Sequence, residues 1–301
     1  MNIAVLPYAY RTRGGLGRVP VTALRWLLGG GETSGTVADL AAADHILIYP
    51  RSKHFVEPRA GVRCQVSLLI AEPFAVQRRH YLAAIALRRR FFRIVTHRPA
   101  MARRAGNALV MPFGGSWVDA GQPQTRAKTA HMSLIASAKT RLEGHALRHR
   151  TAAWCRQTHQ DVDLLGRAYR PLGRKEEGLV PYRYSVVIEN CREEGYFTEK
   201  LVDCLLCGAL PIYWGAPDIA RYFDPDGLIE CRSYDDIRKA IREASAEQHE
   251  ARRAALARNR ERALAYADYE MNAALRLADS TGSKCQASTQ CRLDSLPIVR
   301  R

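Results

Sequence analysis

Polar side chains of kinds that bind nucleotides gather in one short stretch of this sequence. Glu189 and Asn190 follow an apolar run, and Thr198, Glu199 and Lys200 open the next stretch of helical periodicity. A helix N-terminus offers unpaired N–H groups and about half a positive charge, so together with the Lys200 ammonium it suits a diphosphate. Glu199 cannot hold phosphate, but its carboxylate can accept hydrogen bonds from a ribose diol.

The elements around these residues predict where they lie. The run Tyr184–Ile188 is typical of a buried strand, Thr198–Cys207 of a helix, and Pro211–Trp214 of the next strand. Thr198 is the expected N-cap, and Gly208 the expected stop. The polar residues therefore fall where a strand ends and a helix begins, which is the usual ligand edge of a parallel sheet. A purely structural alternative stays open, in which Glu199 complements the helix dipole and Lys200 is solvated.

The same alternation of short apolar runs and longer amphipathic stretches covers most of the chain and predicts an α/β fold. We expect one or two long helices over residues 234–278 and a linker at residues 121–128. The expected strands lie near residues 3–6, 46–49, 66–71, 94–96, 109–111, 132–136, 162–165, 185–188, 211–214 and 228–230.

Composition narrows the class of protein. The 301 residues carry 46 Lys and Arg against 30 Asp and Glu, a formal charge of +16 that attracts phosphate-rich partners or an anionic membrane. No zinc-finger spacing, basic zipper or RNA-binding aromatic motif is present, so we expect no nucleic acid partner. No secretory leader or spanning segment is recognisable, which predicts a cytoplasmic protein that is able to attach to a membrane surface.

The cysteines are better explained by packing than by chemistry. There are eight, scattered along the chain, and without an export signal we expect reduced thiols. Cys204 and Cys207 form a C-x-x-C on an apolar helix face, with no second pair at zinc-site spacing. We expect both to be core residues.

The stretch from Tyr184 to Gly215 also carries a family resemblance. Its Glu-Asn after a strand, its Tyr-x-Thr-Glu-Lys helix start and its Pro-Ile-Tyr-Trp-Gly resemble the signature of glycosyltransferase family 10, the α-1,3/1,4-fucosyltransferases. A thinner similarity extends upstream through residues 137–148 and 162–167. Further upstream, Glu72-Pro73 resembles part of the region that holds the family's general base, without its serine.

This resemblance implies a GT-B fold of two Rossmann-like domains facing each other across a cleft, with C-terminal helices. We expect an acceptor-side domain over residues 1–125, a nucleotide-sugar domain over 126–278 and a disordered tail over 279–301. The implied activity is inverting transfer of fucose from GDP-fucose to a glycan hydroxyl. Glu72 is the implied base, and Arg148 and Lys200 are the implied phosphate clamps. The implied donor-binding residues are Lys139, His145, Arg148, Glu189, Asn190, Tyr196, Thr198, Glu199 and Lys200.

Several alternatives remain beside this interpretation. Asp161 and Asp163 have the D-x-D form of metal-dependent transferases, but the resemblance gives their strand a structural role, so we expect no metal and no other cofactor. His145 can contact phosphate or simply pack. The glycines at 14, 15 and 17 suit an acceptor-side loop, and Arg88–Arg90 a solvated face or a membrane contact. Another nucleotide sugar, or a non-catalytic sugar- or nucleic-acid-binding protein, fits the same fold.

Overall fold

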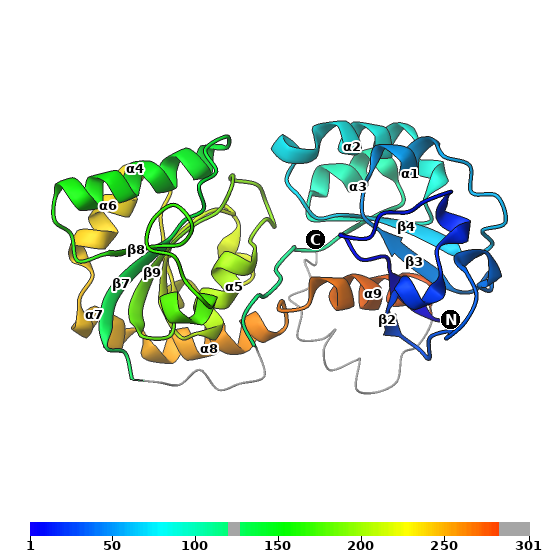
Figure 1. The fold of residues 1–301 in the computed structure, drawn as a ribbon. Coiled ribbons are helices and arrows are strands. Elements are labelled where there is room, and N and C mark those ends of the chain that lie inside the picture. The colour runs from blue at the N-terminus through cyan, green and yellow to red at the C-terminus, as the bar shows by residue number, and fades with distance from the viewer. Residues whose placement is uncertain (120–126, 283–301) are drawn as a thin grey trace. The chain divides into compact units, whose positions relative to one another are not determined.

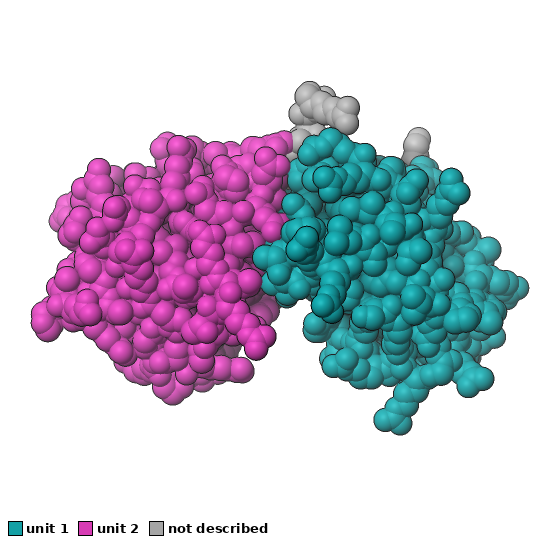
Figure 2. All heavy atoms as spheres, turned by 90° about the horizontal axis from the view of Figure 1, so that it is seen from above, with its two compact units in different colours: residues 1–112, 269–293 teal, residues 113–268, 294–301 magenta. Residues whose placement is uncertain are grey.

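The computed structural model describes residues 1–119 and 127–282, and the chain forms two compact units. The first unit holds Met1–Pro112 and the segment that begins at Tyr269, and the second holds Phe113–Asp268 (Figures 1 and 2). Each unit has its own sheet and its own buried apolar core.

A six-stranded sheet forms the centre of the first unit, in the order β2-β1-β3-β4-β5-β6. All neighbours are parallel except β1 and β2. The strands are β1 (Ile3–Val5), β2 (Arg25–Leu28), β3 (His45–Ile48), β4 (Gln65–Ile70), β5 (Ile94–Thr96) and β6 (Ala108–Val110). The buried strands among them are continuous apolar runs, as expected for a parallel sheet covered on both faces.

Helices cover both faces of this sheet. Helices α1 (Ser52–Val56), α2 (Phe74–Ala86) and α3 (Pro99–Ala105) lie on one face in Figure 1, and α9 (Tyr269–Ser280) lies on the other. Helix α9 contacts β1 and β2 and buries Ala273, Ala274, Leu275 and Leu277. The first unit is thus completed by the C-terminal end of the described chain.

The second unit is built on a five-stranded parallel sheet in the order β11-β10-β9-β7-β8. Its strands are β7 (Ala130–Ile135), β8 (Asp163–Leu165), β9 (Tyr182–Ile188), β10 (Leu210–Trp214) and β11 (Ile229–Glu230). The chain runs from β7 outward to β8, and then returns to the far side of β7 to form β9. The direction of strand addition therefore reverses between β7 and β9.

That reversal sends successive crossover helices to opposite faces of the sheet, because parallel crossovers keep one hand. Helix α4 (Glu143–Gln157) lies with α6 (Tyr234–Glu243) on one face, and α5 (Glu199–Leu206) lies with α8 (Arg253–Leu264) on the other (Figure 1). The predicted α/β class, with two parallel sheets and C-terminal helices, is confirmed.

The prediction of one or two long helices over residues 234–278 is wrong. The structure has four there, since α7 (Ala246–Ala251) separates α6 from α8 and α9 follows. Ala244 is extended, and the Ser245 side chain accepts from the backbone N–H of Gln248, so a new helix starts. Serine at an N-cap stabilises a helix start in a way that alanine content and periodicity do not reveal.

We expected the two domains to divide between residues 125 and 126. In the structure, residues 113–119 contact the second unit, and the segment that begins at Tyr269 contacts the first. Gly114 N–H donates to Phe197 O at 2.9 Å and Gly115 N–H to Tyr266 O at 2.8 Å, which attaches residues 113–119 to the second unit. Most of the expected linker, residues 121–126, and of the expected tail, residues 283–301, lies outside the described residues. Lys128, the last residue of the expected linker, is described by the structure. It belongs to the second unit, and its Nζ donates to Val180 O and Cys207 O, both at 2.8 Å.

Candidate donor-binding site

The reversal of strand order between β7 and β9 defines the ligand edge of the second unit. At such a point the two neighbouring crossovers leave the sheet on opposite faces, and a crevice forms outside the carboxyl ends of the strands. The loops that follow β7 and β9 lead into α4 and α5 there. Eight of the nine side chains expected to bind the donor belong to these two loops and the first turns of these helices, and the ninth, Arg148, lies in the second turn of α4.

The start of α5 is fixed by two side chains. Thr198 is the N-cap, and its hydroxyl accepts from Lys200 N–H at 3.3 Å. Both carboxylate oxygens of Glu189 are engaged by Thr198, which donates from its N–H and its hydroxyl at 2.8 Å each. Glu189 is fully buried. It therefore holds the last residue before the helix against the end of β9, which positions the helix N-terminus.

Lys200 stands between two carboxylates. Its Nζ donates to Glu199 Oε1 and Thr198 Oγ1, each at 3.0 Å, and lies 3.7 Å from Glu189 Oε2. Burial alone lowers the pKa of Lys200, but the charges of Glu189 and Glu199 outweigh it and raise that pKa. Burial likewise raises the pKa of Glu199, yet Lys200 and Lys175 bring it below its ordinary value. Both groups are therefore charged at neutral pH.

Arg148 crosses from α4 to the end of β9. Its Nε donates to Ile188 O at 2.8 Å, and its Nη2 donates to Asn190 Oδ1 at 2.7 Å. The Asn190 amide in turn donates to the Tyr196 hydroxyl at 3.4 Å. Within residues 1–119 and 127–282, nothing accepts a hydrogen bond from Nη1 of Arg148. The guanidinium is thus held by two partners while one nitrogen stays able to bind a ligand oxygen.

The backbones of the two loops touch at Gly144, in the first turn of α4. Its N–H donates to Asn190 O at 3.1 Å, and a Cβ at this position would lie 1.7 Å from Glu189 O. Only glycine permits this approach, so Gly144 sets the distance between Arg148 on α4 and the loop after β9.

His145 and Lys139 occupy the α4 side of the site. His145 is buried, its Nδ1 accepts from Leu142 N–H at 3.3 Å, and burial followed by the Arg148 charge lowers its pKa. Lys139 is exposed, and its carbonyl is within 3.1 Å of His149 Nε2. His145 is therefore a neutral residue that caps its own helix, whereas Lys139 presents its charge to solvent.

Sequence reasoning missed Lys175 and Asp203. Lys175 Nζ donates to Asp203 Oδ2 at 2.6 Å and to Glu199 O at 3.1 Å, and lies 4.9 Å from the centre of the Trp117 ring. Asp203 also accepts from the Ser116 hydroxyl at 2.7 Å. A carboxylate on the apolar face of α5 was a visible signal that a partner exists. Nothing in the sequence indicated that this partner is Lys175, which lies 28 residues away from Asp203.

The other expectations concern residues away from this edge. Asp163 begins β8, so it lies at the amino end of the sheet; its Oδ2 accepts from the Tyr182 hydroxyl at 2.5 Å and is 3.4 Å from Arg170 Nη2. No group of three or more His, Cys, Asp or Glu in the described chain is placed to hold a metal ion. Cys204 and Cys207 are buried core residues, as predicted.

Glu72 belongs to the first unit. It lies two residues beyond the end of β4, at the carboxyl edge of that sheet, and is half-buried. Its carbonyl accepts from the hydroxyl of the buried Tyr81 at 3.0 Å, and that hydroxyl is 3.3 Å from Thr96 Oγ1. The backbone that carries the carboxylate is therefore fixed to α2 and β5.

Two α/β units, each built on a mainly parallel sheet, with a cluster of charged side chains at the switch point of the second, have the GT-B fold. The model of the family described as glycosyltransferase family 10 (fucosyltransferase), C-terminal part, matches residues 126–292, more than half of the chain. The chain belongs to glycosyltransferase family 10. The predicted family is confirmed.

Individual relatives are similar over shorter regions. An α-(1,3)-fucosyltransferase FucT of Helicobacter pylori is 34% identical over 67 residues, which are 22% of this chain and 14% of that protein. The human 3-galactosyl-N-acetylglucosaminide 4-α-L-fucosyltransferase FUT3 is 32% identical over 143 residues, 43% of this chain and 37% of that one. The matches thus span well under two thirds of these relatives.

A solved structure supports the fold alone. The α,α-trehalose-phosphate synthase (UDP-forming) of Burkholderia vietnamiensis superimposes with a TM-score of 0.53 and 11% identity, covering 81% of this chain and 72% of the other. In the described parts of the chain, no helix combines the length and apolarity needed to cross a membrane.

Proposed function

We propose that the chain transfers fucose from GDP-fucose to a hydroxyl of a glycan, with inversion at the anomeric carbon. One observation carries the proposal. The residues shared with the family signature, Glu189-Asn190 and Tyr196–Lys200, lie with Arg148 at the switch point of the second sheet. The relatives named above are fucosyltransferases, and membership of their family extends that activity to this chain.

In the proposed donor site, some residues stabilise the charge of the diphosphate and others form hydrogen bonds. Arg148 and Lys200, with the N-terminus of α5, stabilise the negative charge that grows on the diphosphate as the bond from the sugar carbon to the phosphate oxygen breaks. Glu199 accepts from the ribose hydroxyls. Asn190, Tyr196 and Glu189 keep Arg148 and the helix start in place through their mutual hydrogen bonds.

Glu72 is the proposed general base. The acceptor hydroxyl oxygen forms the new bond to the anomeric carbon, its proton passes to the Glu72 carboxylate, and GDP leaves with the electron pair of the broken bond. Its place at the carboxyl end of β4 supports this role. Glu57 is a weaker alternative, because its carbonyl accepts from Arg90 close to the amino ends of the strands.

Replacing Glu72 by Gln tests the base. The amide keeps the size of the side chain but loses its basicity, so transfer to a working acceptor should fall about 10²–10⁴-fold. GDP affinity, measured by calorimetry, should not change, because the donor residues belong to the other unit. Normal transfer by Glu72→Gln would exclude Glu72 and leave the donor site intact.

We also propose that the reaction needs no metal ion, since Arg148 and Lys200 supply the positive charge. Fucose transfer should continue at an unchanged rate in EDTA. A loss that Mg²⁺ or Mn²⁺ restores would show that a cation bridges the diphosphate.

A nucleotide panel separates this proposal from its competitors. GDP at about a hundredfold its dissociation constant should add about 2.7 kcal/mol of stability. A larger shift with UDP or CMP would indicate another nucleotide sugar, and a shift with DNA oligomers alone would indicate a nucleic-acid-binding protein.

The charge of +16 further suggests contact with anionic membranes, which sedimentation with vesicles at low and high salt would test.

A further inference from the structure

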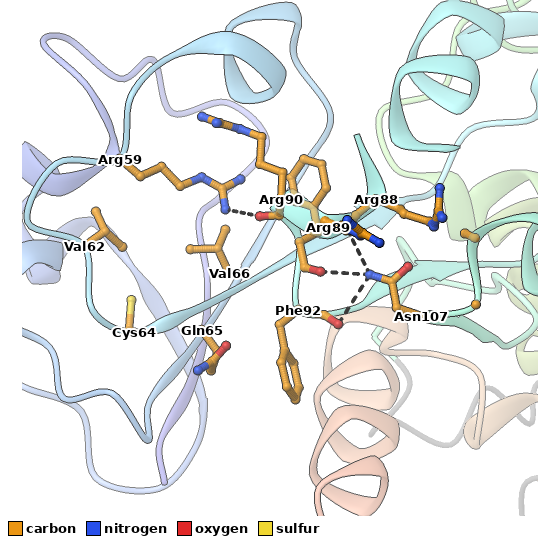
Figure 3. Close-up of a pocket in the computed structure, with 13 residues that line it drawn as sticks. Arg59, Val62, Cys64, Gln65, Val66, Arg88, Arg89, Arg90, Phe92 and Asn107 are labelled. Carbon is orange, nitrogen blue, oxygen red and sulfur yellow. Dashed lines mark hydrogen bonds between the residues drawn. The ribbon is translucent and has the colours of Figure 1, made fainter. Parts of the chain in front are cut away.

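A pocket in the first unit lies at the edge of the sheet opposite to Glu72. It is a cavity of about 630 Å³ at the amino ends of β4, β5 and β6, where Gln65 begins β4 and Asn107 precedes β6 (Figure 3). Glu72 follows the other end of β4, a strand of six residues and therefore about 20 Å long. No residue of the proposed transfer reaction lines it.

The lining is strongly cationic. Arg59, Arg88, Arg89 and Arg90 all contribute to it, and the described lining contains no Asp or Glu. Arg88 and Arg89 are exposed, whereas Arg59 and Arg90 are partly buried. No ion pair joins any of these four to an acid within residues 1–119 and 127–282. Positive charge therefore accumulates here without an internal counterion.

The inner arginine is incompletely satisfied. Arg59 Nη1 donates to Arg90 O at 2.6 Å and its guanidinium lies 4.9 Å from the centre of the Phe91 ring, but Nη2 is buried with no partner in the described chain. Burial and then the Arg90 charge lower the pKa of Arg59 to about 10. A partly buried guanidinium with one nitrogen unpartnered in the described chain is costly, and a bound anion would lower that cost.

The segment that carries three of these arginines is rigidly held. The Asn107 amide donates to Arg88 O at 3.1 Å and to Phe91 O at 2.8 Å, the bonds drawn in Figure 3. Arg90 Nε donates to His54 O at 3.0 Å. A held backbone lowers the entropy lost when the arginine side chains close on a ligand.

We propose that this pocket binds a phosphomonoester, a phosphate group attached to a small organic body. A phosphomonoester carries nearly two negative charges above pH 6, so it offsets more of the arginine charge than a carboxylate does. Planar guanidinium groups match phosphate oxygens in pairs. Val62, Val66 and Phe91 supply apolar wall for the organic part.

The test compares two sources of the same chemistry. Calorimetry with glycerol 3-phosphate measures a free ligand, and sedimentation with phosphatidylcholine vesicles containing phosphatidic acid measures a lipid headgroup. Vesicles with phosphatidylglycerol at equal charge control for diffuse attraction. Arg59→Met keeps the apolar stem but removes the guanidinium, and should weaken binding about tenfold or more, the usual effect of losing a charged hydrogen bond.

Matched variants keep the result interpretable. Arg88→Met with Arg89→Met removes only exposed charges, so it tests the pocket even where Arg59→Met lowers stability. Arg103→Met, on exposed α3 surface outside the pocket, should bind normally. Binding of either probe that is lost with the pocket variants supports the proposal. It is overturned by no binding of either probe, by vesicle retention that is equal on phosphatidylglycerol while glycerol 3-phosphate does not bind, or by loss in Lys200→Ala alone, which would place the phosphate in the donor site.

Discussion

Lys200 is the residue on which the proposed donor site depends most directly. Its ammonium pairs with Glu189 and Glu199, and it is also the proposed phosphate clamp. Lys200→Ala should therefore weaken GDP binding about tenfold or more, and also lower the free energy of unfolding, because the buried Glu189 is left without its cation. Calorimetry with GDP and urea unfolding measure the two effects separately.

Lys239, exposed on α6, provides the matched control for this variant. Lys239→Ala removes the same charge and should change neither quantity, since surface charges far from partners contribute little. Unchanged GDP affinity in Lys200→Ala, together with reduced stability, would make Lys200 a structural residue and remove it from the phosphate site.

For single residues, the sequence predicts roles that depend on neighbours in the chain, but not roles that depend on contacts with residues distant in sequence. Thr198 as an N-cap followed from its position before an apolar-periodic run, and the structure confirms it. Glu189 was expected among the donor-binding residues, and no local pattern indicated that both its carboxylate oxygens would accept hydrogen bonds from Thr198. Lys175 gave no local signal, because its role depends on contacts with α5 that only the tertiary fold creates.

At the scale of elements, α4 can approach the end of β9 only because residue 144 is a glycine and has no side chain. In Gly144→Ala the new Cβ would meet Glu189 O at 1.7 Å, so a backbone must move. We expect a loss of about 1–3 kcal/mol or more in stability, the cost typical of overpacking. GDP binding should fall as well, because Arg148 and Asn190 separate. Thermal unfolding and calorimetry would detect both.

Gly30 offers a suitable comparison, since a Cβ there would meet nothing within 4 Å. Gly30→Ala should unfold at the temperature of the unchanged protein. If Gly144→Ala also kept its stability and its GDP affinity, the contact between the two loops would not control the site.

Strands were predictable where an apolar run in the sequence matches a strand that is buried on both faces of its sheet. The buried parallel strands are short apolar runs, and all ten expected ones lie at observed strands. Strand β2 (Arg25–Leu28) was missed because it is an antiparallel strand of mixed burial that its pattern does not separate from a loop. The C-terminal helices were merged because α6 ends at the extended Ala244 and Ser245 starts α7 within a sequence of uniform helical composition.

On the scale of the whole molecule, the chain passes between the two units near residue 112 and again near residue 268, counting only residues that the structure describes. The first unit is therefore discontinuous in sequence, and helix α9 returns to cover β1 and β2. Glu270 fixes the start of this helix, because its Oε1 accepts from the Tyr49 hydroxyl at 2.5 Å and its Oε2 pairs with Arg25 at 2.6 Å. No local pattern indicated which sheet α9 would join.

Leu275→Ala tests this arrangement. Leu275 is 2% exposed on α9, and truncating a buried leucine costs about 2–5 kcal/mol. Because α9 packs on β1 and β2, hydrogen exchange should lose protection in these two strands, while β9 and β10 keep theirs. Asp279→Ala, at an exposed position of the same helix, should leave both sheets protected. Equal loss of protection in both sheets would mean that the units unfold as one, and loss confined to β9 and β10 would contradict the assignment of α9 to the first unit.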